Sequence, residues 1–498
     1  MSRFNSPVRL PPSLLALIPL LIACSEGAAQ VREPSGEFVS ASRLDRTQTV
    51  SLVQPAGGSN VVAVNGAVAA AGGMGVGMGV GTAGGASTVA SATVGHLDGP
   101  DRLAHLFQRL AVLDDGRGHD DVRILQFGDS HTASDMGTSA FRHALQTRFG
   151  DGGRGFVSLG LPWKNYVQDG VRGCGMNGEF EPQRTWSRLA GSGPDGEFGL
   201  LGVAIGASAG GAQAWTSIGP RFSRFEIAYL RDPQGGSFDV FVDGARAGRV
   251  STRAAAAGAA SGSSASSAGS SGFAAFVTAD APHQIDVRTV GDGGVRVFGV
   301  TVDRPQAGVV VDALGINGAQ IFTQLRLSEE HFDEQVRHEA PALVVLAYGT
   351  NEASDERLDD ATYERGLVDL LGRVSRAAPG AACMLLGPPD LARWTKGTHG
   401  YRTTPRILEI AATQRRVARA AGCAFYDQIE AMGGPGSMAA WASGSSPRAQ
   451  PDRMHLTRAG YTQVGTSLAT DVLRAYDEWR TETGLPPTGE KSLNVARR

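Results

Sequence analysis

Short apolar runs recur along the chain, and amphipathic segments with helical spacing lie between them. The runs are Arg123–Phe127, Val309–Val311, Leu343–Leu346, Met384–Leu386 and Ala424–Tyr426. One intervening segment carries leucines 367, 370 and 371 on a single helical face, and another begins at Thr404-Pro405 and stops at Gly422. Alternating strands and helices of this kind predict an α/β fold in which a parallel sheet is covered by helices on both faces.

One long interval interrupts this alternation. Roughly 160 residues separate the helix after the first run from Gly315, whereas a βαβ unit needs only about 30. Within the interval, apolar residues alternate along short segments, at 225–229, 238–242, 285–287 and 295–297. Turn signals such as Asp243-Gly244 separate these segments, which favours a β-sandwich. We therefore place an inserted β-sandwich domain at Arg184 to Pro305, between two parts of the α/β domain at 98–183 and 306–480.

Four short polar blocks follow one another along the chain, three of them closely after an apolar run. They are Gly128-Asp129-Ser130-His131, Gly315-Ile316-Asn317-Gly318, Gly349-Thr350-Asn351-Glu352 and Asp452-Arg453-Met454-His455. Each block alone is a weak signal. Because ligands bind at the carboxyl ends of parallel strands, the first three blocks are expected on one rim of the sheet.

Together the blocks contain the groups that acyl transfer through a serine nucleophile requires. Ser130 lies at a predicted strand-to-helix turn, His455 would take its hydroxyl proton, and Asp452 would orient the imidazole. The tetrahedral intermediate would be stabilised by the backbone N–H groups of Ser130 and Gly318 and by the side-chain amide of Asn351. No cofactor or metal is expected in this chemistry.

This combination of blocks resembles the SGNH hydrolases, also called the GDSL family. The resemblance spans roughly Arg123–Tyr166 and Gly308–Leu473. It implies a flavodoxin-like three-layer fold and the same catalytic and oxyanion-hole roles for the residues named above. In the second block Gly318 is preferred because the family glycine follows a small polar residue, here Asn317, and Gly315 is the alternative.

Finer features resemble the bacterial peptidoglycan O-acetylesterases. They are carried by Phe127–Ala133, Gly150–Phe156 and Gly315–Gln320, and those enzymes also have a β-rich module between the first two blocks. The resemblance implies a serine esterase that removes O-acetyl groups from a cell-envelope glycan, with peptidoglycan as the favoured polymer. A lipase or lysophospholipase, an O-acetyltransferase and a non-catalytic glycan-binding lipoprotein remain alternatives.

The N-terminus has the features of a targeting segment. Arg3 and Arg9 precede an apolar stretch that ends in Leu21-Ile22-Ala23-Cys24, which resembles a bacterial lipobox with Cys24 as the lipidated residue. Residues 1–23 are then a lipoprotein signal peptide, 24–97 a Gly/Ala-rich tether and 481–498 a polar tail. We expect a location in the cell envelope, at the outer membrane or facing the periplasm. The alternative is an ordinary signal peptide cut near Ala29.

The net charge and the cysteine spacing limit which ligands the chain is expected to bind. The net charge is −3, so no electrostatic argument favours nucleic acid. Cysteines 174, 383 and 423 have no Cys-x-x-Cys spacing or nearby His that would indicate a metal site. Cys383 and Cys423 each open a predicted strand, and a disulfide and two buried thiols remain equally open. We expect a monomer.

Other residues compete with Ser130 and His455 for the catalytic roles. Ser208 lies in a Gly-x-Ser-x-Gly pattern, but a nucleophile elbow needs a strand before it and a helix after it, and here a run of small residues follows. His131 is adjacent to Ser130 but is interpreted as a turn residue, because neighbouring side chains seldom face each other. Trp163, Tyr166 and Trp215 could stack on sugar rings, although core packing is favoured.

Overall fold

The computed structural model describes residues 93–164, 166–177, 181–184, 195–254 and 270–485. The predicted signal peptide, the lipidation site Cys24 and most of the predicted tether lie outside the described residues. The first described strands pair with the main sheet, so this sheet begins before the predicted domain start at residue 98.

A seven-stranded sheet forms the centre of the α/β domain, in the order β1-β2-β18-β15-β14-β3-β13. Its strands are β1 (Thr93–Val94), β2 (Leu97–Asp98), β3 (Val122–Gly128), β13 (Val309–Gly315), β14 (Leu343–Ala347), β15 (Ala382–Leu386) and β18 (Ala424–Tyr426). Strands β3, β13, β14, β15 and β18 are parallel. These five strands contain all five predicted apolar runs. In chain order they run 2-1-3-4-5, which is the flavodoxin-like order.

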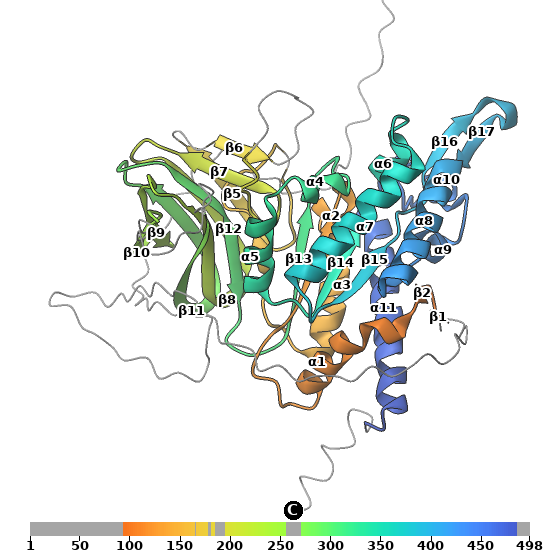
Figure 1. Ribbon diagram of the computed structural model, residues 1–498, viewed down its shortest axis with the longest axis horizontal. Helices are drawn as coiled ribbons and strands as arrows, with labels where there is room; N and C mark the ends of the chain where they lie inside the picture. The colour runs from red at the N-terminus through yellow and green to blue at the C-terminus, as the bar shows by residue number, and fades with distance from the viewer. Residues whose placement is uncertain (1–92, 165, 178–180, 185–194, 255–269, 486–498) are drawn as a thin grey trace, which may run out of the picture.

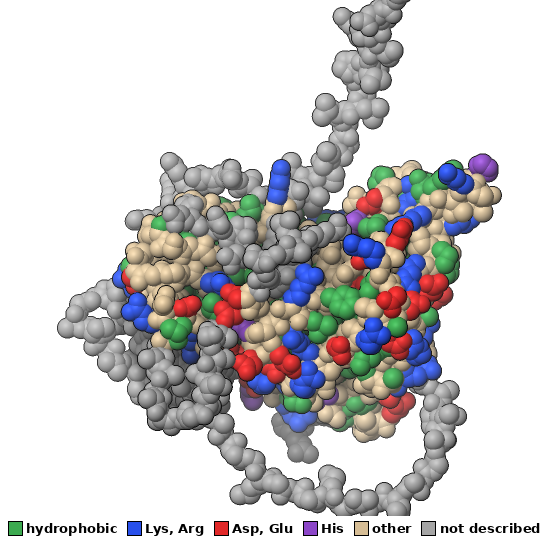
Figure 2. Space-filling model, turned by 45° about the horizontal axis from the view of Figure 1, so that its top comes forward, with side chains coloured by type: hydrophobic (Ala, Val, Ile, Leu, Met, Phe, Trp, Pro, Cys, Tyr) green, Lys and Arg blue, Asp and Glu red, His purple; other side chains and the backbone are tan. Residues whose placement is uncertain are grey.

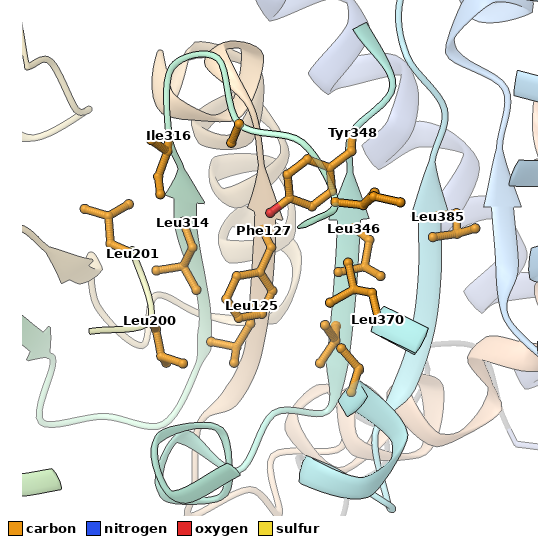
Figure 3. Packing of buried hydrophobic residues seen from close by; sticks show 14 of the residues in the cluster. Leu125, Phe127, Leu200, Leu201, Leu314, Ile316, Leu346, Tyr348, Leu370 and Leu385 are labelled. Carbon is orange, nitrogen blue, oxygen red and sulfur yellow. The ribbon is translucent and has the colours of Figure 1, made fainter. Parts of the chain in front are cut away.

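Helices cover both faces of this sheet (Figure 1). One face packs against α1 (Ala104–Asp114), α3 (Met136–Phe149) and α11 (Arg458–Glu482), and the other against α5 (Glu329–Glu339), α7 (Asp360–Ala377) and α8 (Pro405–Ala421). Successive strand residues enter opposite cores: Ile124 faces the α11 side and Leu125 the α7 side. Figure 3 shows Leu125, Phe127 and Leu346 in the second of these cores. The predicted three-layer α/β fold is confirmed.

A second, antiparallel sheet lies beside the α/β domain (Figure 1). Its strands are β4 (Gly155–Val157), β5 (Val171–Asn177), β6 (Glu181–Arg184), β7 (Val203–Ala207), β8 (Gln213–Arg231), β9 (Ser237–Val242), β10 (Ala245–Ser251), β11 (Ser270–Thr289) and β12 (Val295–Asp303). The long strands β8 and β11 run through two layers. They pair with each other along most of their length. Residues 213–218 of β8 also pair with β5 and residues 285–289 of β11 with β9, whereas residues 224–229 of β8 pair with β12. Apolar side chains from both layers form one core, as in a sandwich.

This β-rich region begins earlier than the predicted boundary at Arg184. Strands β4 and β5 precede that residue, and they pair with β12 and β8. The region also shares a core with the α/β domain, because Leu200 and Leu201 pack beside Leu314 (Figure 3). A three-residue strand such as β4 has too little alternation to be recognised from sequence, which explains the misplaced boundary.

Short elements complete the fold at and around the ends of the parallel strands. They are η1 (Pro100–Leu103), α2 (Ser130–Ala133), α4 (Phe322–Leu325), α6 (Thr350–Ser354), β16 (Ala392–Thr395), η2 (Lys396–Thr398), β17 (Gly400–Thr403), α9 (Gln428–Met432) and α10 (Ser437–Trp441). None of the helices in the described ranges has both the length and the hydropathy that crossing a membrane requires.

A disulfide joins neighbouring strands at one side of the sheet. Cys383 in β15 is bonded to Cys423, which directly precedes β18, with a Cα–Cα distance of 4.8 Å. Of the two alternatives that the sequence left open, the structure has the bonded form. Disulfides persist in oxidising compartments.

A buried ion cluster fixes the chain between α2 and β4. Asp135 is fully buried, and its carboxylate accepts hydrogen bonds from Arg142 at 2.9 Å and from Arg154 at 2.6 Å. The backbone N–H of Asp169 donates to the same carboxylate at 3.0 Å. Asp135 thereby holds three separate segments together close to the serine turn.

Asp135→Ala is expected to destabilise the fold by about 3–5 kcal/mol, because two buried guanidinium groups lose their shared counter-charge. Urea unfolding of the purified protein measures this free energy. Asp477→Ala is the matched control, since Asp477 forms an exposed ion pair with Arg148 at 3.3 Å that should contribute no more than about 1 kcal/mol. Equal losses for both variants would contradict the expected role of the cluster.

Candidate active site

The turn that presents Ser130 joins β3 to α2. Asp129 caps this helix by accepting a hydrogen bond from the His131 N–H at 2.9 Å, and its own N–H donates to the Ala347 carbonyl at 3.3 Å. A Cβ on Gly128 would lie 2.7 Å from that carbonyl, so only glycine fits this close approach. Asp129 therefore holds the turn through its side chain and its backbone.

Three polar side chains form a continuous chain of hydrogen bonds at this turn. The Ser130 hydroxyl lies 3.0 Å from Nε2 of His455, and Nδ1 of His455 lies 2.7 Å from the Asp452 carboxylate. Although 325 residues separate Ser130 from His455, the fold brings them into hydrogen-bond contact. The structure thus joins the first block to the last in the geometry of a serine, a base and an orienting acid.

Asp452 is held in place by its own turn. Its second carboxylate oxygen accepts hydrogen bonds from the backbone N–H groups of Met454 and His455, both at 3.0 Å. Burial on its own would raise the pKa of Asp452, but the hydrogen bonds from the His455 side chain and from these N–H groups outweigh it and hold the pKa below its usual value. The carboxylate therefore stays ionised beside the imidazole.

The second and third blocks meet beside the serine turn. The Asn351 amide donates to the Ala319 carbonyl at 2.9 Å, next to Gly318, which has a φ of 76°. An asparagine amide has two hydrogens, so one remains for another acceptor. Gly315, the alternative glycine, is the last residue of β13 and pairs with Gly128 in the sheet. The loop that follows that strand leaves Gly318 exposed.

A buried carboxyl group that the sequence analysis missed joins these two blocks. Glu352 accepts hydrogen bonds from the Ile321 N–H at 2.8 Å and from the Gly349 N–H at 3.0 Å. Burial raises the pKa of Glu352 to about 7, against the effect of these hydrogen bonds. The sequence signal was a capping-box spacing, in which an acidic residue lies three positions after the helix N-cap at Gly349.

His131 lies behind the reacting groups. Its Nδ1 is 2.9 Å from the Tyr461 hydroxyl, and its ring centroid is 5.4 Å from that of His455. Within the described part of the chain its Nε2 is buried without a hydrogen-bond partner. Burial, together with the nearby His455, lowers the pKa of His131 to about 3. A neutral ring that is a neighbour of the His455 ring fits the structural role that the sequence predicts for His131. The sequence did not indicate Tyr461.

The low pKa of His131 should make the folded protein less stable in acid. Its pKa is about 3 in the folded protein and about 6.5 in an unfolded chain, so the unfolded state binds the proton first as the pH falls. The stability associated with neutral His131 is present above about pH 6.5 and is lost progressively below it. His131→Gln, which does not titrate, should therefore lose less thermal stability than the wild type between about pH 7 and pH 5. Parallel curves for the two proteins would contradict this expectation.

The other candidate residues from the sequence lie elsewhere in the fold. Ser208 follows β7 and precedes the antiparallel strand β8, so the helix that a nucleophile elbow needs is missing. Trp163 and Tyr166 are buried in the core, as favoured, and Trp215 lies half-buried on β8. In the described ranges, no group of three or more His, Cys, Asp or Glu side chains is placed to hold a metal ion.

One family model and several solved structures match this chain. Residues 286–463 match the model of the GDSL-like lipase/acylhydrolase family. A solved structure of a peptidoglycan O-acetylesterase is 26% identical to this chain, with a TM-score of 0.61, and the match covers 75% of this chain and 96% of that one. No curated protein matches the sequence.

A more distant solved structure is a family two carbohydrate esterase from Clostridium thermocellum in complex with cellohexaose. It is 11% identical with a TM-score of 0.24, and the match covers 57% of this chain and 96% of that one. Another is a carbohydrate esterase family 2 enzyme from Corynascus thermopiles, 13% identical with a TM-score of 0.26, covering 54% and 95% of the respective chains.

Proposed function

We propose that this chain, a carboxylic ester hydrolase of the GDSL-like lipase/acylhydrolase or SGNH type, removes O-acetyl groups from peptidoglycan. The observation that carries the proposal is the contact of Ser130 with His455 at 3.0 Å, with Asp452 behind it at 2.7 Å. The likeness to a peptidoglycan O-acetylesterase supports the choice of polymer.

In the proposed first step, the Ser130 oxygen attacks the acetyl carbonyl carbon while Nε2 of His455 takes the hydroxyl proton. The carbonyl oxygen becomes an oxyanion, and N–H groups of Ser130, Gly318 and Asn351 stabilise it. The intermediate collapses as the C–O bond to the sugar breaks. The imidazolium of His455 gives its proton to the departing sugar oxygen, which leaves an acetyl group on Ser130.

In the second step a water molecule replaces the sugar. His455 removes a proton from this water, which attacks the acetyl carbon and forms a second tetrahedral intermediate. Its collapse releases acetate and returns the proton to Ser130. A sugar hydroxyl in place of water would make the same acetyl-enzyme a transferase.

Initial rates of acetate release test the substrate directly. The purified protein is given O-acetylated peptidoglycan, acetylated xylan and soluble esters of increasing acyl length. We expect peptidoglycan to be the polymer with the highest kcat/KM and the rate to fall sharply beyond short acyl chains. A preference for long acyl chains would instead indicate a lipase, and loss of ester without free acetate would indicate transfer.

We further propose that Cys24 is the lipidated mature N-terminus and anchors the protein in the cell envelope. The Leu21-Ile22-Ala23-Cys24 sequence is the supporting observation. Mass spectrometry of the N-terminal peptide from the native host tests it. A lipidated peptide that begins at Cys24 is expected, and an unmodified peptide that begins further downstream would reject the anchor.

A further inference from the structure

A hairpin stands out from the α/β domain near the carboxyl ends of the parallel strands. It is formed by β16 and β17 with the turn between them, residues Ala392–Thr403, and is called the arm below (Figure 1). Four large apolar side chains in the described ranges are exposed, and Trp394 on the arm is the most exposed of them at 55%. It is also the only aromatic ring among the four.

The arm is also strongly basic. It carries Arg393, Lys396 and Arg402 together with His399, all exposed, and contains no Asp or Glu. Within the described ranges, none of the three cations forms an ion pair with a carboxylate. Figure 2 shows the arm reaching away from the body at the upper right, with blue and purple side chains towards its end. This local charge contrasts with the net charge of −3 for the chain.

The arm is attached to the turn that carries the candidate base. Tyr401 is the cross-strand partner of Trp394, with ring centroids 5.2 Å apart. The Arg453 guanidinium lies 3.5 Å from the Tyr401 ring centroid, and the Ala392 N–H donates to the Arg453 carbonyl at 3.2 Å. Arg453 is in the Asp452–His455 block, so the arm contacts the turn that carries two of the reacting groups.

The base of the arm also touches the helix of the candidate oxyanion donor. Leu391, which precedes β16, belongs to a small apolar cluster against which Met454 and Ala353 pack. Met454 precedes His455, and Ala353 lies on α6 two residues after Asn351. Two separate contacts thus place the arm on the same rim as Ser130.

We propose that the arm binds sugar rings and carboxylates of the acidic glycan strand whose acetyl ester reacts at Ser130, which rests on the function proposed above. An indole face packs on the apolar C–H face of a pyranose ring, and unpaired cations attract carboxylates such as those on peptidoglycan peptides. The basic charge favours an acidic glycan over a neutral one such as xylan. The arm then guides the polymer towards the serine, whereas a small ester needs no such contact.

The test measures binding in the Ser130→Ala background, where no turnover occurs. The protein is sedimented with insoluble peptidoglycan sacculi, both O-acetylated and base-treated. Trp394→Val keeps a strand-forming residue but removes the ring, and we expect it to weaken binding roughly tenfold, as loss of a central interface Trp commonly does. Trp394→Tyr should restore most of the binding. Val368→Ala, at an exposed apolar position on α7, is the control and should have no effect.

The charge contribution is tested separately. Arg402→Glu should weaken binding several-fold, and its effect should shrink at high salt and with sacculi whose carboxylates are blocked as amides. Arg474→Glu makes the same charge change at an exposed site on α11, about 24 Å further along that helix than its start. This control should bind like the parent protein.

The arm and the proposed function can fail independently. Arm variants with Ser130 intact should hydrolyse a small acetyl ester at the parental rate, and their kcat/KM on O-acetylated peptidoglycan should fall through KM. Unchanged sacculus binding by Trp394→Val would overturn the proposal. So would Trp394-dependent binding to anionic lipid vesicles without sacculus binding, or Trp394-dependent dimerisation in sedimentation. If no acetate is released from peptidoglycan but binding still requires Trp394, the function fails and the arm stands.

Discussion

Ser130→Ala is expected to abolish hydrolysis of acetyl esters, with kcat/KM falling at least about a thousandfold. The serine oxygen forms the covalent acetyl-enzyme. A water molecule that replaces it as the nucleophile is neither positioned nor activated as the serine oxygen is. Initial rates with a soluble acetyl ester measure the loss. The fold should be unaffected, because the Ser130 side chain contributes one hydrogen bond to His455 and no packing that a methyl group cannot keep.

Ser208→Ala is the matched control for this substitution. Ser208 lies in the rival Gly-x-Ser-x-Gly pattern, within the antiparallel region, and its variant should keep the full rate. Melting curves of both variants should overlay the wild type. A fully active Ser130→Ala protein would end the serine-ester account, and a loss confined to Ser208→Ala would move the nucleophile to the β-rich region.

Asn351→Ala should lower kcat roughly a hundredfold or more while KM changes little, since an oxyanion donor acts mainly in the transition state. The amide is already oriented by its hydrogen bond to the Ala319 carbonyl at 2.9 Å, so no reorganisation is needed during the reaction. Steady-state kinetics on a soluble acetyl ester separate the two constants. Asn317→Ala, in the exposed loop of the second block, is the control and should retain normal kcat. A raised KM at unchanged kcat would instead assign Asn351 to ground-state binding.

The parallel sheet could be predicted because its strands are buried on both faces. Runs such as Val309–Val311 are continuously apolar, and the pattern of helix starts and stops between them is clear. Helix α8 is an example, since it starts at Pro405 and ends with Gly422 in the left-handed conformation. The start of the β-rich region could not be predicted in the same way, because β4 and β5 are defined by distant partners. The partner of β4 is β12, more than a hundred residues further along the chain, and the partner of β5 is β8, about forty residues further along.

The reacting groups could be placed by sequence because each has a characteristic side chain after a strand or in an Asp-x-x-His turn. The residues that hold these groups in place could not be found from the sequence. Glu352 and Tyr461 act through contacts with residues from other elements, Ile321 and His131, and a lone Glu or Tyr on a helix carries no distinguishing pattern. The arm was missed for a related reason, since its proximity to His455 depends on the contact between Tyr401 and Arg453.

Covalent labelling tests the central claim most directly. The wild-type protein is treated with a fluorophosphonate, which reacts with serines activated by a neighbouring base, and the modified peptide is identified by mass spectrometry. The account predicts a single label on Ser130, formed in proportion to the loss of esterase activity and absent from His455→Ala. A label on Ser208, or complete inactivation with Ser130 unmodified, would contradict it.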